Sequence, residues 1–161
     1  MTAREFAYHR SIGPMMWVFV AIATTELAIV HLLVAMWSSW VALILSAVTL
    51  GSIIWLVGAI RSFATLPVRI GDGHLLMRVG TLKQVATPLE NVAGLAPSWD
   101  ATLLKQRDTI NLALIAYPNV VVLLRAPVAA SRGRMVTRIA HRLDDPAAFA
   151  AALEALGQGD D

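Results

Sequence analysis

The chain has 161 residues, of which 57% are hydrophobic and only 15% are charged, with a net charge of +2. Soluble domains usually carry about a quarter of charged residues, so this balance predicts a membrane protein and excludes an ordinary soluble globule. The chain has no cysteine, which excludes disulfides, thiolate nucleophiles and metal sites built on Cys.

Two apolar runs dominate the first third of the chain. Residues 14–37 contain one acidic residue, Glu26, and no Lys or Arg, and residues 40–60 contain no charged residue. Each run reaches the length of about 20 residues that a helix needs to cross the hydrocarbon core of a bilayer. The first run is too long for the core of a signal peptide. Since only Ser38–Ser39 separates the runs, the sequence predicts an antiparallel transmembrane hairpin.

The positive charges around the runs predict an orientation. Arg4 and Arg10 lie in the N-terminal segment, residues 1–13, while Arg61 and Arg69 follow the second run. The turn between the runs has no charge. By the positive-inside rule we expect a multi-pass protein of the inner membrane with both termini in the cytoplasm.

Two polar residues inside the first run, Glu26 and His31, are candidates for a functional site. Both helices rise about 1.5 Å per residue, so residues at equal depth on the two sides of the turn have numbers that sum to about 77. Glu26 then lies level with Ser52, and His31 lies level with Ser46. We expect Glu26 to be protonated or hydrogen-bonded to Ser52 or Thr49, and His31 to be bonded to Ser46 or to a neighbouring subunit.

Two interpretations of Glu26 are open, because an ionisable residue at membrane depth is a functional candidate by default. One is a proton, ligand or subunit-contact site, and the other is a hydrogen bond that locks the hairpin. Glu26 and His31 point about 140° apart around the helix, so together they do not form a two-ligand metal site. We expect no metal and no cofactor.

The pattern changes to short strands and one helix over residues 61–156. Gly71–Asp72–Gly73 predicts a tight turn between two strands. Asp145 is expected to cap a helix that starts at Pro146 and ends at Gly157, before an acidic tail at residues 157–161. The expected strands cover residues 67–70, 74–79, 82–87, 91–95, 109–115, 119–125 and 134–143, with an irregular or short helical insert at residues 98–108.

Three stretches in this order, PVRIGDGHLLMRVG, VATPLENVAGL and LDDPAAFAAALEAL, resemble the bacterial PH-like domains that are attached to membrane hairpins. The likeness covers roughly residues 65–156. It implies a small two-sheet barrel or sandwich capped by a helix, and an interaction or assembly module without enzyme activity. The expected fold class is therefore a membrane α-helical hairpin followed by an α+β, mainly β PH-like module with antiparallel strands and a C-terminal helix.

The expected module is basic. Residues 61–142 hold eleven Lys or Arg against four Asp or Glu, which favours an anionic membrane surface as a partner. Few aromatic residues accompany these cations, so we expect no nucleic acid. Arg134, Arg138 and Arg142 share one face of a strand, because side chains repeat every two residues. They are candidates for contact with lipid headgroups, and an ordinary solvated strand face is the alternative.

Three functions compete. The leading hypothesis is an integral inner-membrane protein whose PH-like module serves protein interaction or the assembly of a membrane complex, with a protein partner or a second copy of the chain. The second is an accessory subunit of a transport or electron-transfer complex that uses Glu26 and His31 as intramembrane polar ligands. A membrane-bound enzyme is disfavoured, because the sequence contains no phosphate-binding glycine loop and no G-x-S-x-G motif.

Overall fold

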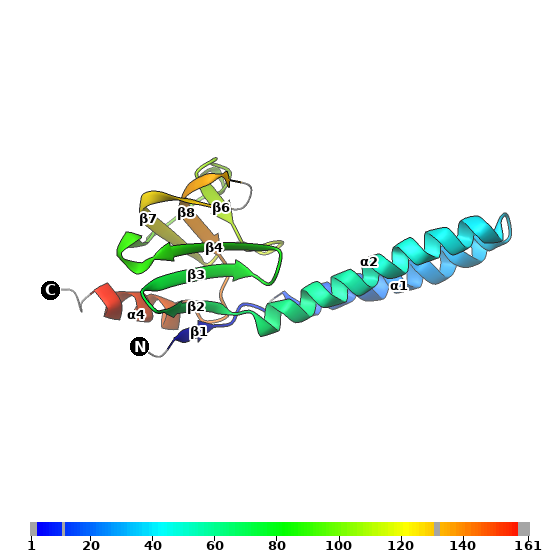
Figure 1. The fold of residues 1–161 in the computed structure, drawn as a ribbon, viewed down its shortest axis with the longest axis horizontal. Coiled ribbons are helices and arrows are strands. Elements are labelled where there is room, and N and C mark those ends of the chain that lie inside the picture. The colour runs from blue at the N-terminus through cyan, green and yellow to red at the C-terminus, as the bar shows by residue number, and fades with distance from the viewer. Residues whose placement is uncertain (1–2, 11, 131–132, 158–161) are drawn as a thin grey trace.

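A long helical hairpin projects from a domain of two β-sheets and a C-terminal helix (Figure 1). This computed structural model describes residues 3–10, 12–130 and 133–157. The hairpin consists of α1 (Gly13–Ala35) and α2 (Ser39–Thr65), and both helices are long and apolar enough to cross a membrane. The predicted arrangement of a hairpin followed by a sheet domain with a closing helix is confirmed. Of the predicted acidic tail, residues 158–161 lie outside the described residues.

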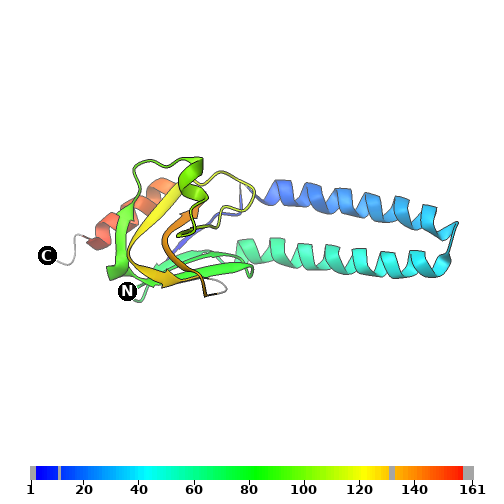
Figure 2. The same ribbon diagram turned by 90° about the horizontal axis from the view of Figure 1, so that it is seen from above.

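The two helices run antiparallel and pack along one seam (Figure 2). The less exposed positions alternate in steps of three and four residues, which is the spacing of coiled-coil packing. On α1 they include Gly13, Met16, Val20, Ala23, Leu27, Val30 and Val34, and on α2 they include Ala42, Ser46, Thr49, Ile53, Leu56, Ile60 and Phe63. This seam fixes which side chains of each helix face outward.

Helix α2 continues to Thr65, beyond the end predicted at residue 60. Its last turn packs against the domain, where Phe63 is buried in the core. The backbone N–H of Thr81 donates to Ser62 Oγ at 3.3 Å, which ties the same turn to a loop of the domain. Packing against the domain therefore extends the helix beyond its apolar run.

The first sheet has four antiparallel strands in the order β1-β2-β3-β4. Strands β2 (Val68–Gly71) and β3 (His74–Val79) are joined by the predicted tight turn, in which Asp72 and Gly73 both have positive φ, of 53° and 73°. Two successive residues with positive φ match the twist that a two-residue hairpin needs. The other two strands are β1 (Arg4–Phe6) and β4 (Lys83–Pro88).

Strand β1 lies in a segment that the sequence indicated only as an N-terminal extension, residues 1–13. Phe6 pairs with Val68 of β2, so the chain contributes strands to one sheet from both sides of the hairpin. Glu5 and Arg69 form an ion pair across these strands. Tyr8 is fully buried, so this segment is part of the domain core.

The second sheet has the strand order β5-β7-β8-β6. A short 3-10 helix, η1 (Leu89–Asn91), leads from the first sheet into the second. The sheet consists of β5 (Val92–Leu95), β7 (Val120–Ala129), β8 (Met135–His141) and β6 (Thr109–Asn111).

Strand β6 runs parallel to β8, so the expectation of antiparallel strands throughout is wrong here. The insert contains the short helix α3 (Ala101–Leu104) and carries the chain to the edge of the sheet before β6 begins. Strand β6 also ends four residues earlier than predicted. The Asn111 side chain accepts a hydrogen bond from the backbone of Ala113, and Leu114 has a φ of 51°, so the chain turns away from the sheet.

The apolar side chains of both sheets and of helix α4 (Pro146–Gly157) form one core. Asp145 Oδ1 accepts from the Ala148 N–H at 2.9 Å, so the predicted cap of this helix is confirmed. Phe149 is fully buried and packs edge-on against Phe6, with ring centroids 5.1 Å apart. Helix α4 thus covers the edge of the core where the N-terminal strand lies.

Candidate functional site

The polar residues of the hairpin fall into two different environments. His31 Nδ1 lies 2.7 Å from Ser46 Oγ, and Ser46 belongs to the seam between the helices. This is the pairing that equal depth on the two helices predicted. His31 therefore joins α1 to α2 within the hairpin.

Glu26 does not meet the side chains expected for it. Ser52 Oγ donates to Val48 O at 2.9 Å, and Thr49 Oγ1 donates to Leu45 O at 3.0 Å, so both hydroxyls bond to their own helix. Within the described part of the chain, the Glu26 carboxyl has no hydrogen-bonding partner. Its side chain is exposed beside the seam.

Glu26 lines a shallow groove on the outer surface of α1, and a second groove lies on α2. The first is lined by Ala21, Ile22, Thr25, Glu26, Ile29 and Val30, and the second by Val48, Gly51, Ser52, Trp55 and Leu56. Glu26 precedes the seam residue Leu27 and Ser52 precedes the seam residue Ile53. In an antiparallel pair, these equivalent flanking positions lie on the same side. We call this side of the hairpin the Glu26 flank.

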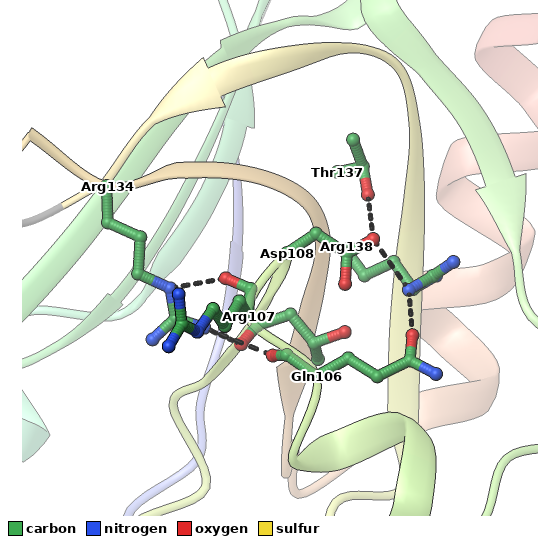
Figure 3. Close-up of polar contacts among 7 residues, drawn as sticks. Gln106, Arg107, Asp108, Arg134, Thr137 and Arg138 are labelled. Atoms are coloured by element: carbon green, nitrogen blue, oxygen red, sulfur yellow. Dashed lines mark hydrogen bonds and ion pairs between the residues drawn. The ribbon is translucent and has the colours of Figure 1, made fainter.

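The three arginines predicted to contact lipid headgroups bind internal acceptors instead of standing free. Arg134 donates through Nε to Arg107 O at 2.6 Å and through Nη2 to Gln106 O and Thr109 O (Figure 3). Arg142 Nη1 donates to Tyr117 O at 3.1 Å. These two guanidinium groups hold the backbone on both sides of β6.

Arg138 completes this cluster. Its Nη1 lies 2.9 Å from Asp108 Oδ2 and 2.7 Å from Gln106 Oε1 (Figure 3). Thr137 Oγ1 donates to the same carboxylate oxygen of Asp108 at 2.9 Å. Of the three arginines only Arg138 lies within β8, and the contacts of Arg134 and Arg138 hold the insert onto the second sheet. The sequence sign of these contacts was the stretch Gln106–Asp108, which is rich in hydrogen-bond acceptors. It lies 26 or more positions before the arginines, so the sequence alone did not pair the two segments.

A buried polar cluster, His141 with Tyr8, was not identified from the sequence. His141 Nε2 lies 2.9 Å from Arg78 O, and His141 Nδ1 lies 2.7 Å from the backbone N and 3.1 Å from the backbone O of Arg142. The Tyr8 hydroxyl donates to Leu66 O at 3.0 Å and accepts from the Gly80 N–H at 2.5 Å. The two rings lie 5.0 Å apart.

This cluster connects the N-terminal segment, the end of α2, β3 and β8. Burial lowers the pKa of the His141 imidazole and raises the pKa of the Tyr8 phenol. The burial of His141 could have been inferred from the sequence, because alternate side chains of a strand share a face and His141 follows the buried Ile139 by two residues. The cluster is closed to solvent, so it supports the fold and does not offer a binding site.

The described ranges offer few groups of side chains that could bind a metal ion. No group of three His, Asp or Glu side chains is gathered there that could hold a metal ion. The exposed carboxyl of Glu26 on an apolar helix surface is the outstanding polar feature. No protein-family model, curated protein or solved structure matches the chain.

Proposed function

We propose that this chain is an integral inner-membrane protein whose hairpin anchors a PH-like module in the assembly of a membrane complex. Both hairpin helices have the length and apolar composition of membrane spans, and neither is enclosed by the domain. Trp37 and Trp40, beside the turn, are 80% and 75% exposed, as expected for aromatic residues at a membrane interface. The cations of both flanking segments favour a cytoplasmic position for the domain.

The PH-like identity of the domain is supported by its architecture. Two four-stranded sheets enclose one core, and a C-terminal helix covers an edge of it. This is the arrangement that the resemblance implied for roughly residues 65–156. Such a domain provides surfaces for protein interaction.

The observation that carries the proposal is the exposed carboxyl of Glu26. It lies near the middle of a membrane span, where an ionised group costs a few kcal/mol or more. The hairpin supplies it with no hydrogen bond among the described residues, while small residues such as Gly51 and Ser52 lie on the same flank. Small residues let helices approach closely and make polar contacts effective. We therefore propose that the Glu26 flank binds a membrane helix of a partner protein or of a second copy.

The exposed carboxyl also favours a second function, that of an accessory subunit in a transport or electron-transfer complex. In that case Glu26 would supply an ionisable group to a pathway shared with other subunits. His31 would not act with it, because its ring is bonded to Ser46 inside the hairpin.

Replacing Glu26 distinguishes these functions. Glu26→Leu removes the polar contact and should weaken the association of membrane helices roughly three- to thirtyfold, which corresponds to about 0.6–2 kcal/mol. Glu26→Gln keeps a hydrogen-bonding group of the same shape and should retain most of the association. The measurement is cross-linking and co-purification from native membranes in mild detergent, titrated with detergent to dilute the complex.

Thr24→Leu is the matched control, because Thr24 is exposed on the same helix away from the two grooves and its hydroxyl bonds only to Val20 O. An accessory-subunit role predicts that Glu26→Gln leaves assembly intact and abolishes the activity of the complex. If Glu26→Leu captures the same partners and oligomers as the unmodified chain, the assembly proposal is wrong.

A further inference from the structure

The loop at residues 112–119 exposes three large apolar or aromatic side chains. Leu114, Ile115 and Tyr117 are 36%, 50% and 54% exposed, although the loop is short. Single exposed apolar residues are common on soluble surfaces, but a group of them marks an interaction site. A fourth exposed apolar side chain, Leu82, lies in the turn between β3 and β4.

This loop has a fixed shape. Its ends are bonded to β8, with Leu112 N donating to Ala140 O at 2.8 Å and Asn119 N donating to His141 O at 3.0 Å. Its far side is held by Arg142, which donates to Tyr117 O. Leu114 takes a left-handed conformation, which costs about 1–2 kcal/mol for a residue with a side chain. The protein thus maintains a strained backbone that keeps apolar side chains in solvent contact.

The loop lies at the end of the domain from which the hairpin leaves. Both views show the segment between β6 and β7 reaching toward the hairpin side, as does the turn between β3 and β4 (Figures 1 and 2). Contacts place the two segments there as well. In the turn between β3 and β4, the Thr81 N–H donates to Ser62 of α2. Arg142, which holds the loop, lies two residues before Asp144. The Asp144 carboxylate accepts from the backbone N–H of Arg10, just before α1.

Helix geometry places this end of the domain at the bilayer surface. The apolar run of α2 from Trp40 to Ile60 covers about 30 Å at 1.5 Å per residue, which is the thickness of the hydrocarbon core. Ser62 follows within one helical turn and therefore lies in the headgroup region. A cation, Arg61, separates the two positions, as expected at a membrane boundary.

We propose that Leu114, Ile115 and Tyr117, together with Leu82, insert into the headgroup region of the same leaflet that the hairpin enters. This second attachment fixes the orientation of the domain on the membrane. The partner is a lipid surface, because the hairpin holds the loop beside the bilayer and Tyr, with an apolar ring and a polar hydroxyl, prefers that interface. The inference depends on the proposed membrane-spanning hairpin.

The absence of cysteine allows single-site labelling of the full chain. Ile115→Cys would carry an environment-sensitive fluorophore in vesicles of phosphatidylethanolamine and phosphatidylglycerol. Glu90→Cys, on η1 and exposed, is the matched probe at the end of the domain away from the hairpin. Leu50→Cys, exposed on the surface of α2, reports whether the hairpin is inserted.

We expect the probe at residue 115 to emit at shorter wavelength than the probe at residue 90, and to be quenched several-fold more by nitroxide-labelled lipids than by aqueous iodide. The probe at residue 90 should show the reverse. If residue 50 is shielded from iodide while residue 115 is quenched like residue 90, the loop does not touch the membrane and the inference is overturned. If residue 50 is itself open to iodide, the membrane-spanning proposal fails first.

Discussion

His141 is the residue whose charge state matters most for the domain. Its ring is fully buried, with Nε2 beside a backbone carbonyl of β3 and Nδ1 beside the backbone that follows β8, and burial favours the neutral form of the ring. Tyr8 packs against it, and the Arg78 and Arg142 backbones supply its hydrogen bonds. Protonation of the ring would place a charge in the core, and burial disfavours that charged form more than the nearby backbone carbonyls stabilise it.

Acid should therefore destabilise the folded domain. Burial holds the pKa of His141 in the folded protein below its ordinary value of about 6.5, so the unfolded chain binds more protons between the two values. This contribution to the free energy of unfolding is complete above about pH 6.5 and is lost as the pH falls toward the folded pKa. The thermal midpoint in mild detergent, measured from pH 8 to pH 5, should decrease over this range.

The residue responsible can be identified by substitution. His141→Gln should lower stability at every pH by about 1–3 kcal/mol, because the buried backbone groups lose ideal partners, and it should remove most of the slope. His74→Gln, at an exposed histidine of β3, should keep the slope of the unmodified chain. A slope unchanged in His141→Gln would assign the pH dependence to other groups.

Strand β1 extends the folded domain to the N-terminal side of the hairpin. It pairs with β2, and the segment that follows it places Tyr8 and Ile12 among the fully buried side chains. Replacing a buried aromatic residue with Ala typically costs about 3–5 kcal/mol, so losing this whole segment exceeds the stability of most small domains. The N-terminal residues therefore belong to the folding unit although the hairpin separates them from it in sequence.

A fragment that begins at Arg61 should accordingly fail to fold. Joining residues 3–12 to residue 61 through a short Gly/Ser linker, without the hairpin, should restore a cooperative unfolding transition. Circular dichroism and the fluorescence of Trp99 during urea denaturation would measure both proteins. Equal stability of the fragment with and without residues 3–12 would show that β1 does not contribute to the stability of the domain.

The arrangement of the whole molecule places both ends of the hairpin against the same domain. Met16 of α1 and Phe63 of α2 both contact its core, so hairpin and domain form one continuous packed structure. A force or ligand that tilts the hairpin would therefore change its packing against the sheets. For the proposed membrane-spanning hairpin, this continuity requires the N-terminal strand and the C-terminal domain to lie on one side of the membrane.

Labelling from the two sides of the inner membrane tests that topology. Met36→Cys, 86% exposed at the turn, should react with a membrane-impermeant maleimide added to intact spheroplasts. Glu90→Cys should react only after the membrane is opened. Reaction of both positions from the same side would contradict a spanning hairpin, and reaction of Glu90→Cys alone would reverse its orientation.

The hairpin, most of the strands and the last helix were predictable because their signals are local. An apolar run of membrane length, the Asp72–Gly73 turn and the Asp145–Pro146 cap each act within a few residues. The contact of His31 with Ser46 was also accessible, since a tight turn and a constant helical rise fix the depth of each residue. These features need no knowledge of distant parts of the chain.

Tertiary structure decided the features that depend on distant partners. The three residues of β1 form a strand because β2, more than 60 positions later in the chain, offers an open edge. The period of a strand predicted a shared face for Arg134, Arg138 and Arg142, but only the folded insert and the loop before β7 supply their acceptors. Position along the hairpin followed from counting residues. The exposure of Glu26 depended on which side chains form the seam, because packing fixes the rotation of a helix about its axis and sequence length does not.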